Sequence, residues 1–126
     1  MTKNKYLTLL SDDQKKEFYN FSNEVTFNSK TQIIYSGQIP MAAYLLLEGS
    51  ITLKDAQKRV IRTCDPNSLL GFSEIYNNQS YRYTAEIDAN SKVLILDRST
   101  IKEMQSKLDQ STVDQTLSFQ KLVESA

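Results

Sequence analysis

The sequence predicts an α+β fold: an antiparallel β-roll of the jelly-roll kind, with one helix before it and two helices after it. Short apolar or alternating runs of strand length follow one another from Val25 to Asp97. Turn-forming residues separate these runs, which is typical of a sandwich, roll or barrel. Helix-capping patterns stand before and after this region, so the helices are segregated from the strands, as in α+β domains.

The first predicted helix begins near Ser11. Ser11 and Gln14 form a capping-box pattern, in which each side chain satisfies a backbone N–H of the first turn. Asp12 falls in that turn, where the helix dipole favours negative charge. Phe18 and Phe21 share one face, so we expect this helix to pack on a core.

The predicted strands are short and rich in β-branched and aromatic residues. They are Val25–Phe27, Gln32–Tyr35, Ala43–Leu47, Ser50–Lys54, Arg59–Thr63, Tyr83–Asp88 and Lys92–Leu96. Tyr83, Ala85 and Ile87 alternate with polar residues, so we expect one face of their strand to be buried. The segment Asp65–Ser68 is predicted to be a turn.

Two helices are predicted after the strands. Thr100 and Glu103 form a second capping-box pattern, and Ile101 and Met104 fall on one face. The last segment runs from Thr112 to Glu124. Two interpretations stay open for its apolar residues: they pack on the roll, or they form a helix through which two copies of the chain make a homodimer.

Length and charge limit the classes of partner. A chain of 126 residues suits a single domain, here residues 1–126. Its 15 basic and 15 acidic residues balance, so it lacks the electrostatics that drive binding to nucleic acid. No run of like charge indicates a membrane surface, and no apolar stretch is long enough to cross a bilayer. We therefore expect neither nucleic acid nor membrane as a partner.

Histidine and cysteine usage limits the chemistry. The sequence has no histidine, which excludes histidine metal sites, histidine bases and Ser–His or Cys–His nucleophiles. We therefore expect no enzyme, no metal site and no cofactor. Cys64 stands alone, which fits a reducing compartment. Met1–Leu10 lacks the features of a signal peptide, so a cytoplasmic protein is predicted.

Short motifs recur in a defined order along the chain. They read Ile34-Tyr35-Ser36-Gly37-Gln38, Tyr44-Leu45-Leu46-Leu47-Glu48-Gly49-Ser50-Ile51, Pro66-Asn67-Ser68-Leu69-Leu70-Gly71 and Arg82-Tyr83-Thr84-Ala85. Together they resemble the cyclic nucleotide-binding domain of the catabolite activator and Fnr family of bacterial regulators. That family has a glycine in an early turn, a strand of the form yyLl.G.v, and a phosphate-binding cassette that closes on R-(A/S)-(A/T). The resemblance covers most of the chain.

The resemblance implies a ligand site in the cassette, which we define as Pro66–Ala85. In the family, N–H groups after the last cassette glycine and the cassette arginine hold the cyclic phosphate. Gly71 and Arg82 occupy the matching positions. The ligand-binding residues that this implies are Gly71, Ser73, Glu74, Arg82, Tyr83 and Thr84. The ligand would be a cyclic nucleotide or another small anion.

The cassette also departs from the family pattern. Phe72 stands where nucleotide-binding members carry the glutamate that accepts a ribose hydroxyl, and the nearest acid is Glu74. Asn67 replaces the usual glycine. The segment Leu69–Ile75 resembles the Fnr-type sequence LIGFDAI, which belongs to regulators that use this fold without a cyclic nucleotide. A single cysteine, Cys64, excludes an iron–sulfur sensor.

Two functional hypotheses follow. The first is a stand-alone regulatory module without a DNA-binding domain, which senses a small anion and signals to a partner protein through its C-terminal helices. The second is a degenerate roll that binds no ligand and acts as a protein–protein interaction or dimerisation domain. Phe72 discriminates between them, because a ring in the nucleotide pocket would block a ligand. Structural roles also stay open: Arg82 as a surface partner of Glu86 or Glu74, and Glu74 as a first-turn carboxylate.

Overall fold

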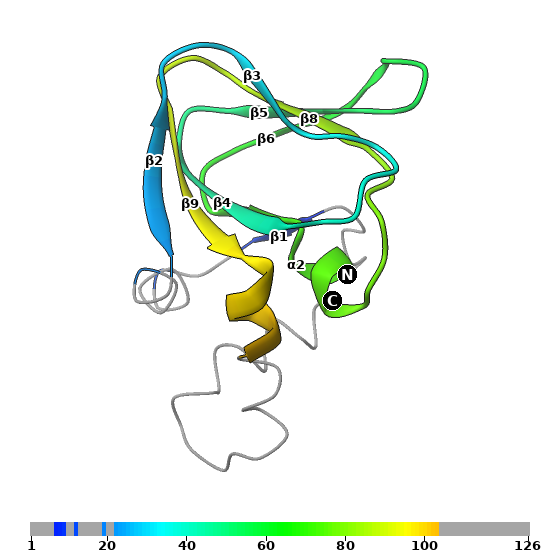
Figure 1. Cartoon of the computed structure of the whole chain (residues 1–126). Coiled ribbons are helices and arrows are strands. Elements are labelled where there is room, and N and C mark those ends of the chain that lie inside the picture. Colours follow the sequence, from blue (N-terminus) through cyan, green and yellow to red (C-terminus); the bar gives the residue numbers. More distant parts are fainter. Residues whose placement is uncertain (1–6, 10–11, 13–18, 20–21, 104–126) are drawn as a thin grey trace.

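The structure is a computed structural model that describes residues 7–9, 12, 19 and 22–103 (Figure 1). Asp12 and Tyr19 are helical; the rest of the predicted first helix lies outside the described residues. So does the predicted final segment, Thr112–Glu124. Over the described residues the chain forms two antiparallel sheets.

One sheet has five strands and the other has four. The order in the first is β1 (Leu7–Leu9), β7 (Ser68–Leu70), β4 (Ala42–Glu48), β9 (Ser91–Asp97) and β2 (Asn23–Phe27). The order in the second is β3 (Thr31–Ile34), β8 (Thr84–Ile87), β5 (Ile51–Lys54) and β6 (Val60–Cys64). Each predicted strand is present within about two residues, and the prediction of an antiparallel roll is confirmed.

The sequence did not predict β1 and β7. Each has three residues, which is too short for a periodic pattern to show. The predicted turn Asp65–Ser68 ends one residue too late, because Ser68 already belongs to β7. Asn67 makes the turn with a φ of 77°, and the Ser68 hydroxyl donates to the Asp65 carbonyl oxygen at 2.7 Å.

The space between the two sheets holds the first of two apolar clusters, which we call the inter-sheet core. Its buried members are Ile34, Leu46, Ile51, Leu53, Cys64, Leu70, Tyr81, Tyr83, Ala85, Ile87 and Val93. Tyr83, Ala85 and Ile87 are all fully buried, so the alternation predicted for this strand is confirmed. Cys64 packs here as a small apolar side chain.

The other face of the five-stranded sheet carries the second cluster, which we call the helix-side core. Its buried members are Ala43, Leu45, Leu69, Phe72, Ile75, Leu94, Leu96 and Ile101. Figure 1 shows the helices that cover this face, α2 (Phe72–Tyr76) and the helical residues 98–103, on the side away from β3, β5, β6 and β8. The cassette helix and the C-terminal helical residues therefore share one core.

The C-terminal helical residues begin earlier than the sequence predicted. Thr100 was expected to cap the helix, yet residues 98–100 are already helical. Asp97 provides the cap, because its Oδ1 accepts the Thr100 backbone N–H at 2.9 Å and the Ser99 hydroxyl at 2.9 Å. The hydrogen bond from Thr100 holds the pKa of Asp97 below its ordinary value. The strand β9 thus leads directly into the helix.

Candidate ligand-binding site

Gly71 forms the turn between β7 and α2. Its φ is 89°, a conformation that residues with a Cβ adopt only with strain. A Cβ at this position would lie 2.8 Å from the Tyr81 hydroxyl and 2.9 Å from the Ala42 carbonyl oxygen. Glycine is therefore required here both by the backbone conformation and by the close approach of the cassette to β4.

Phe72 begins α2 and does not enter the space between the sheets. It is 2% exposed and belongs to the helix-side core, where its ring stacks on Tyr76 with 6.1 Å between centroids. The sequence analysis made Phe72 the residue that discriminates between a ligand-binding roll and a ligand-free one. Its ring packs in the helix-side core and does not occupy the space between the sheets.

Glu74 sits in the first turn of α2 and is buried, with 9% of its surface exposed. The phenol of Tyr83 lies beside its carboxylate and interacts with it electrostatically. Burial raises the pKa of Glu74 above its ordinary value, while the Tyr83 hydroxyl and the positive charge of Arg82 oppose the rise. The buried carboxylate, the phenol and the arginine thus act on one another electrostatically.

Tyr83 fills space between the sheets at the end of the cassette. It is 0% exposed, and the ring of Tyr81 meets it edge-on with 5.7 Å between centroids. Burial raises the pKa of both tyrosines. The family pattern has alanine or serine at the position of Tyr83, so a large ring occupies volume here that a small residue would leave open.

Arg82 is exposed, although it lies between two buried tyrosines. Its guanidinium makes no hydrogen bond or salt bridge with another residue in the part of the chain that the structure describes. Glu86 was one structural partner considered from the sequence, but Glu86 instead pairs with Lys54 at 2.8 Å and with Lys30 at 3.9 Å. The charge of Arg82 acts on Glu74 without a direct ion pair.

Ser73 and Thr84 are half-buried and point elsewhere. Ser73 Oγ accepts a hydrogen bond from the side chain of Asn77 at 3.4 Å. Thr84 follows Tyr83 along the chain and so projects to the opposite face of its strand; its Oγ1 accepts the Ser36 backbone N–H at 3.5 Å. Of the residues that the sequence singled out, Glu74, Arg82 and Tyr83 are brought together, while Ser73 and Thr84 bond to neighbouring segments.

Asn78 connects the cassette to the C-terminal helical residues, which sequence reasoning missed. Its Oδ1 accepts hydrogen bonds from Arg98 Nη2 at 3.2 Å and from Lys102 Nζ at 2.8 Å. Arg98 also donates from Nη1 to the Pro40 carbonyl oxygen at 3.1 Å. These partners are twenty or more residues apart in the sequence, so no local sequence motif predicts the contact.

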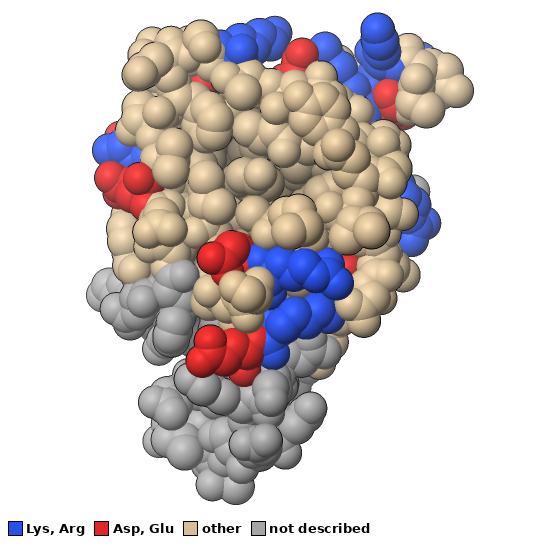
Figure 2. All heavy atoms as spheres, viewed as in Figure 1, with Lys and Arg blue, Asp and Glu red and all other residues tan. Residues whose placement is uncertain are grey.

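Charge is mixed over the surface. On the face shown in Figure 2, acidic and basic side chains stand side by side without a broad patch of one sign. Among the described residues, no group of three or more Cys, Asp or Glu is placed to hold a metal ion. No helix among them has the length and apolar character needed to span a membrane.

Comparisons with known proteins agree with this geometry. The family model of the cyclic nucleotide-binding domain matches residues 24–107. The fold is similar to that of the catabolite activator protein of Thermus thermophilus, with a TM-score of 0.67 and 17% identity over 91% of this chain and 54% of that one. It is also similar to the sensor domain of the transcriptional regulator DNR from Pseudomonas aeruginosa, with a TM-score of 0.64 and 16% identity over 91% of this chain and 81% of that one. The curated proteins include no match to the sequence.

Proposed function

Because the chain belongs to the cyclic nucleotide-binding domain family, we propose that it is a regulatory module that binds a small anionic ligand, a cyclic nucleotide foremost, at Arg82. One observation carries the proposal. The guanidinium of Arg82 is exposed and makes no hydrogen bond or salt bridge with another described residue. It also stands at the family's spacing from Gly71, which is held in the required turn.

The chemistry of the site favours an anion with a nearby hydroxyl. A guanidinium gives phosphate charge-assisted hydrogen bonds, each worth about 1.5–3 kcal/mol. Glu74 supplies a carboxylate acceptor, the same chemical group as the family's ribose-binding glutamate. Since the phenol of Tyr83 already lies beside this carboxylate, a ligand hydroxyl would compete with it as a donor.

The signal would leave through the C-terminal helical residues. Ile75 of α2 and Ile101 pack in the same helix-side core, and Asn78 bonds to Arg98 and Lys102. A ligand that shifts α2 therefore shifts the helical residues 98–103 with it, since packed elements move as units. The output goes to a partner protein that contacts this region.

The test is thermal unfolding of the full chain with and without cyclic AMP, cyclic GMP, cyclic di-AMP and cyclic di-GMP. A ligand at about 100 times its dissociation constant stabilises the folded state by about 2.7 kcal/mol, which raises the midpoint measurably. We expect Arg82→Gln to abolish the shift. Arg59→Gln is the matched control, because Arg59 carries the same charge but is held by Asp55. A shift that survives in Arg82→Gln would place the anion elsewhere.

A second candidate is a ligand-free protein–protein interaction or dimerisation domain. Tyr83 favours it, because its fully buried ring fills space between the sheets. Ile39 and Met41 also expose large apolar side chains close to the bond between Pro40 and Arg98. If no nucleotide shifts the midpoint, sedimentation of the chain should reveal self-association that Met41→Asp or Ile39→Asp removes. A ligand-free chain that stays monomeric would leave a partner protein as its target.

A further inference from the structure

Tyr83 fills the interior of the roll directly after Arg82 in the chain. Its side chain is 0% exposed and belongs to the inter-sheet core, whose members come from both sheets. Arg82 is exposed, and its charge acts on the carboxylate of Glu74, beside which the phenol of Tyr83 lies. A ligand on the Arg82 guanidinium therefore meets the chain from outside, while the neighbouring ring occupies the interior.

The neighbours of Tyr83 hold its ring in place. The ring of Tyr81 meets it edge-on with 5.7 Å between centroids. Tyr81 is itself anchored, because its hydroxyl donates to the Ala42 carbonyl oxygen at 2.8 Å and its backbone N–H donates to the Gln38 carbonyl oxygen at 3.0 Å. Moving the Tyr83 ring outward would give up these contacts and expose a buried aromatic side chain, so the ring is a fixed part of the core.

The volume of this ring matters for a ligand that carries a base. An apolar cavity of about 150 Å³ takes up a benzene-sized molecule, so a hole of ring size accepts a ring-sized guest. Protein interiors are close-packed, and here Tyr83 fills that volume. Alanine or serine, which the family pattern has at this position, would leave it open. The base of a nucleotide bound at Arg82 therefore has no place between the sheets of this chain.

We infer that Tyr83 is a specificity-determining residue of the Arg82 site: its ring keeps a base out of the space between the sheets, so that the chain recognises a small phosphate ester by its phosphate and not by a base. The inference rests on the proposed function, because Arg82 holds the phosphate. Charge-assisted hydrogen bonds from a guanidinium to phosphate do not depend on the base. The competing role for Tyr83 is packing alone, without any effect on the choice of ligand.

The experiment measures binding of cyclic AMP, cyclic GMP, cyclic CMP and ribose 5-phosphate to the full chain by calorimetry. We expect the wild type to bind the three cyclic nucleotides within about threefold of one another. Ribose 5-phosphate should bind at least as tightly, because its phosphate carries more negative charge. These comparisons need no variant, so they test the inference whether or not a substitution at Tyr83 folds.

The variant Tyr83→Ser opens the space that the ring fills. It should tighten binding of cyclic CMP, which carries a single-ring base, by roughly 5- to 150-fold, the gain from covering one base. Ile87→Ala is the control for loosened packing, because Ile87 is fully buried in the same core, roughly 13 Å further along the chain.

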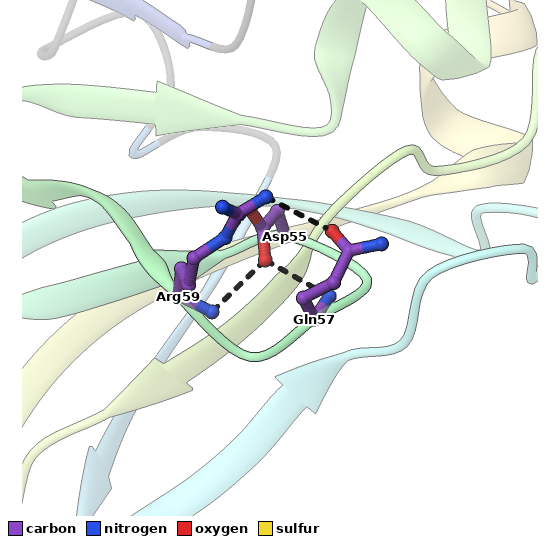
Figure 3. Close-up of polar contacts among 3 residues, drawn as sticks. All are labelled: Asp55, Gln57 and Arg59. Atoms are coloured by element: carbon purple, nitrogen blue, oxygen red, sulfur yellow. Dashed lines mark hydrogen bonds and ion pairs between the residues drawn. The ribbon is translucent and has the colours of Figure 1, made fainter.

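The control for charge is Arg59→Gln. Arg59 bonds to Asp55 and Gln57 in the β5–β6 hairpin (Figure 3). Neither this variant nor Ile87→Ala should change the affinity for cyclic CMP by more than about threefold. Arg82→Gln should abolish binding both in the wild type and in combination with Tyr83→Ser.

The outcomes separate this inference from the proposed function. If the wild type prefers one base beyond the threefold range and binds it through Arg82, the ligand site stands and the role of Tyr83 is wrong. Equal gains in Tyr83→Ser and Ile87→Ala, or no gain in a folded Tyr83→Ser, would assign Tyr83 to packing alone. If only Tyr83→Ser binds cyclic CMP and the wild type binds none of the four compounds, the proposed function fails and the role of Tyr83 stands. If neither protein binds any of them, both proposals fail.

Discussion

Gly71→Ala is expected to destabilise the fold much more than Gly37→Ala, although the two glycines share one backbone conformation. Their φ angles are 89° and 90°, where a Cβ costs about 1–2 kcal/mol by itself. At Gly37 an added Cβ would meet nothing within 4 Å. The backbone strain is therefore the whole expected cost of Gly37→Ala.

At Gly71 the added Cβ would also collide with the donor and the acceptor of a hydrogen bond. It would lie 2.8 Å from the Tyr81 hydroxyl and 2.9 Å from the Ala42 carbonyl oxygen, and this hydroxyl donates to this carbonyl at 2.8 Å. The new methyl group forces the two atoms apart. Losing a buried hydrogen bond costs about 1–3 kcal/mol, so the total for Gly71→Ala is about 2–5 kcal/mol.

The assay is urea denaturation followed by far-ultraviolet circular dichroism. With equal slopes, the difference between the midpoints gives the difference in the free energy of unfolding. Gly37→Ala serves as the control for strain. Equal losses in the two variants would refute the reasoning, because they would mean that the contact of Gly71 with Tyr81 and Ala42 adds nothing.

Two further predictions concern buried titratable groups. Burial raises the pKa of Glu74 from an ordinary value of 4.5. The stability that depends on its protonated form is therefore complete below pH 4.5, the ordinary value. That stability is lost as the pH rises through the folded-state pKa. Urea denaturation between about pH 4 and pH 7 should therefore show the wild type losing stability relative to Glu74→Gln as the pH rises; a difference that stays constant with pH would contradict this. Burial also raises the pKa of Cys64 to about 11, and its side chain is buried, so a thiol reagent should label it only when the chain opens. Labelling in native buffer at the rate of the unfolded chain would show that Cys64 is accessible.

Most of the strands could be predicted from the sequence because burial leaves two recognisable patterns: alternation in half-buried strands and a continuous apolar run in strands buried on both faces. Leu46 and Val93 face the inter-sheet core, while Leu45 and Leu94 face the helix-side core. A strand buried on both faces reads as a continuous apolar run, and both β4 and β9 do so. The short strand β1 pairs with β7, and β7 pairs also with β4; these long-range contacts leave no local pattern.

The candidate site was less predictable, because several of its contacts are tertiary. The motifs identified Gly71 and Arg82, and the structure gives each a physical role. The electrostatic contact between Glu74 and Tyr83 joins α2 to the residue before β8, and the position of Phe72 depends on which face of α2 meets the sheet. Sequence spacing constrains neither of these, since both follow from how the cassette packs on β4.

Arg62 shows most clearly why the sequence alone does not always tell which face of a sheet a strand residue occupies. The hairpin closes on the pair Lys54 and Val60, and a regular ladder counted from that pair would place Arg62 opposite Thr52, on the outer face. A bulge adds one residue between this pair and the next, and Arg62 lies opposite Leu53 instead. Because a shift of one residue exchanges the faces of a strand, this single irregularity places a basic residue of the hairpin on the same face as Leu53.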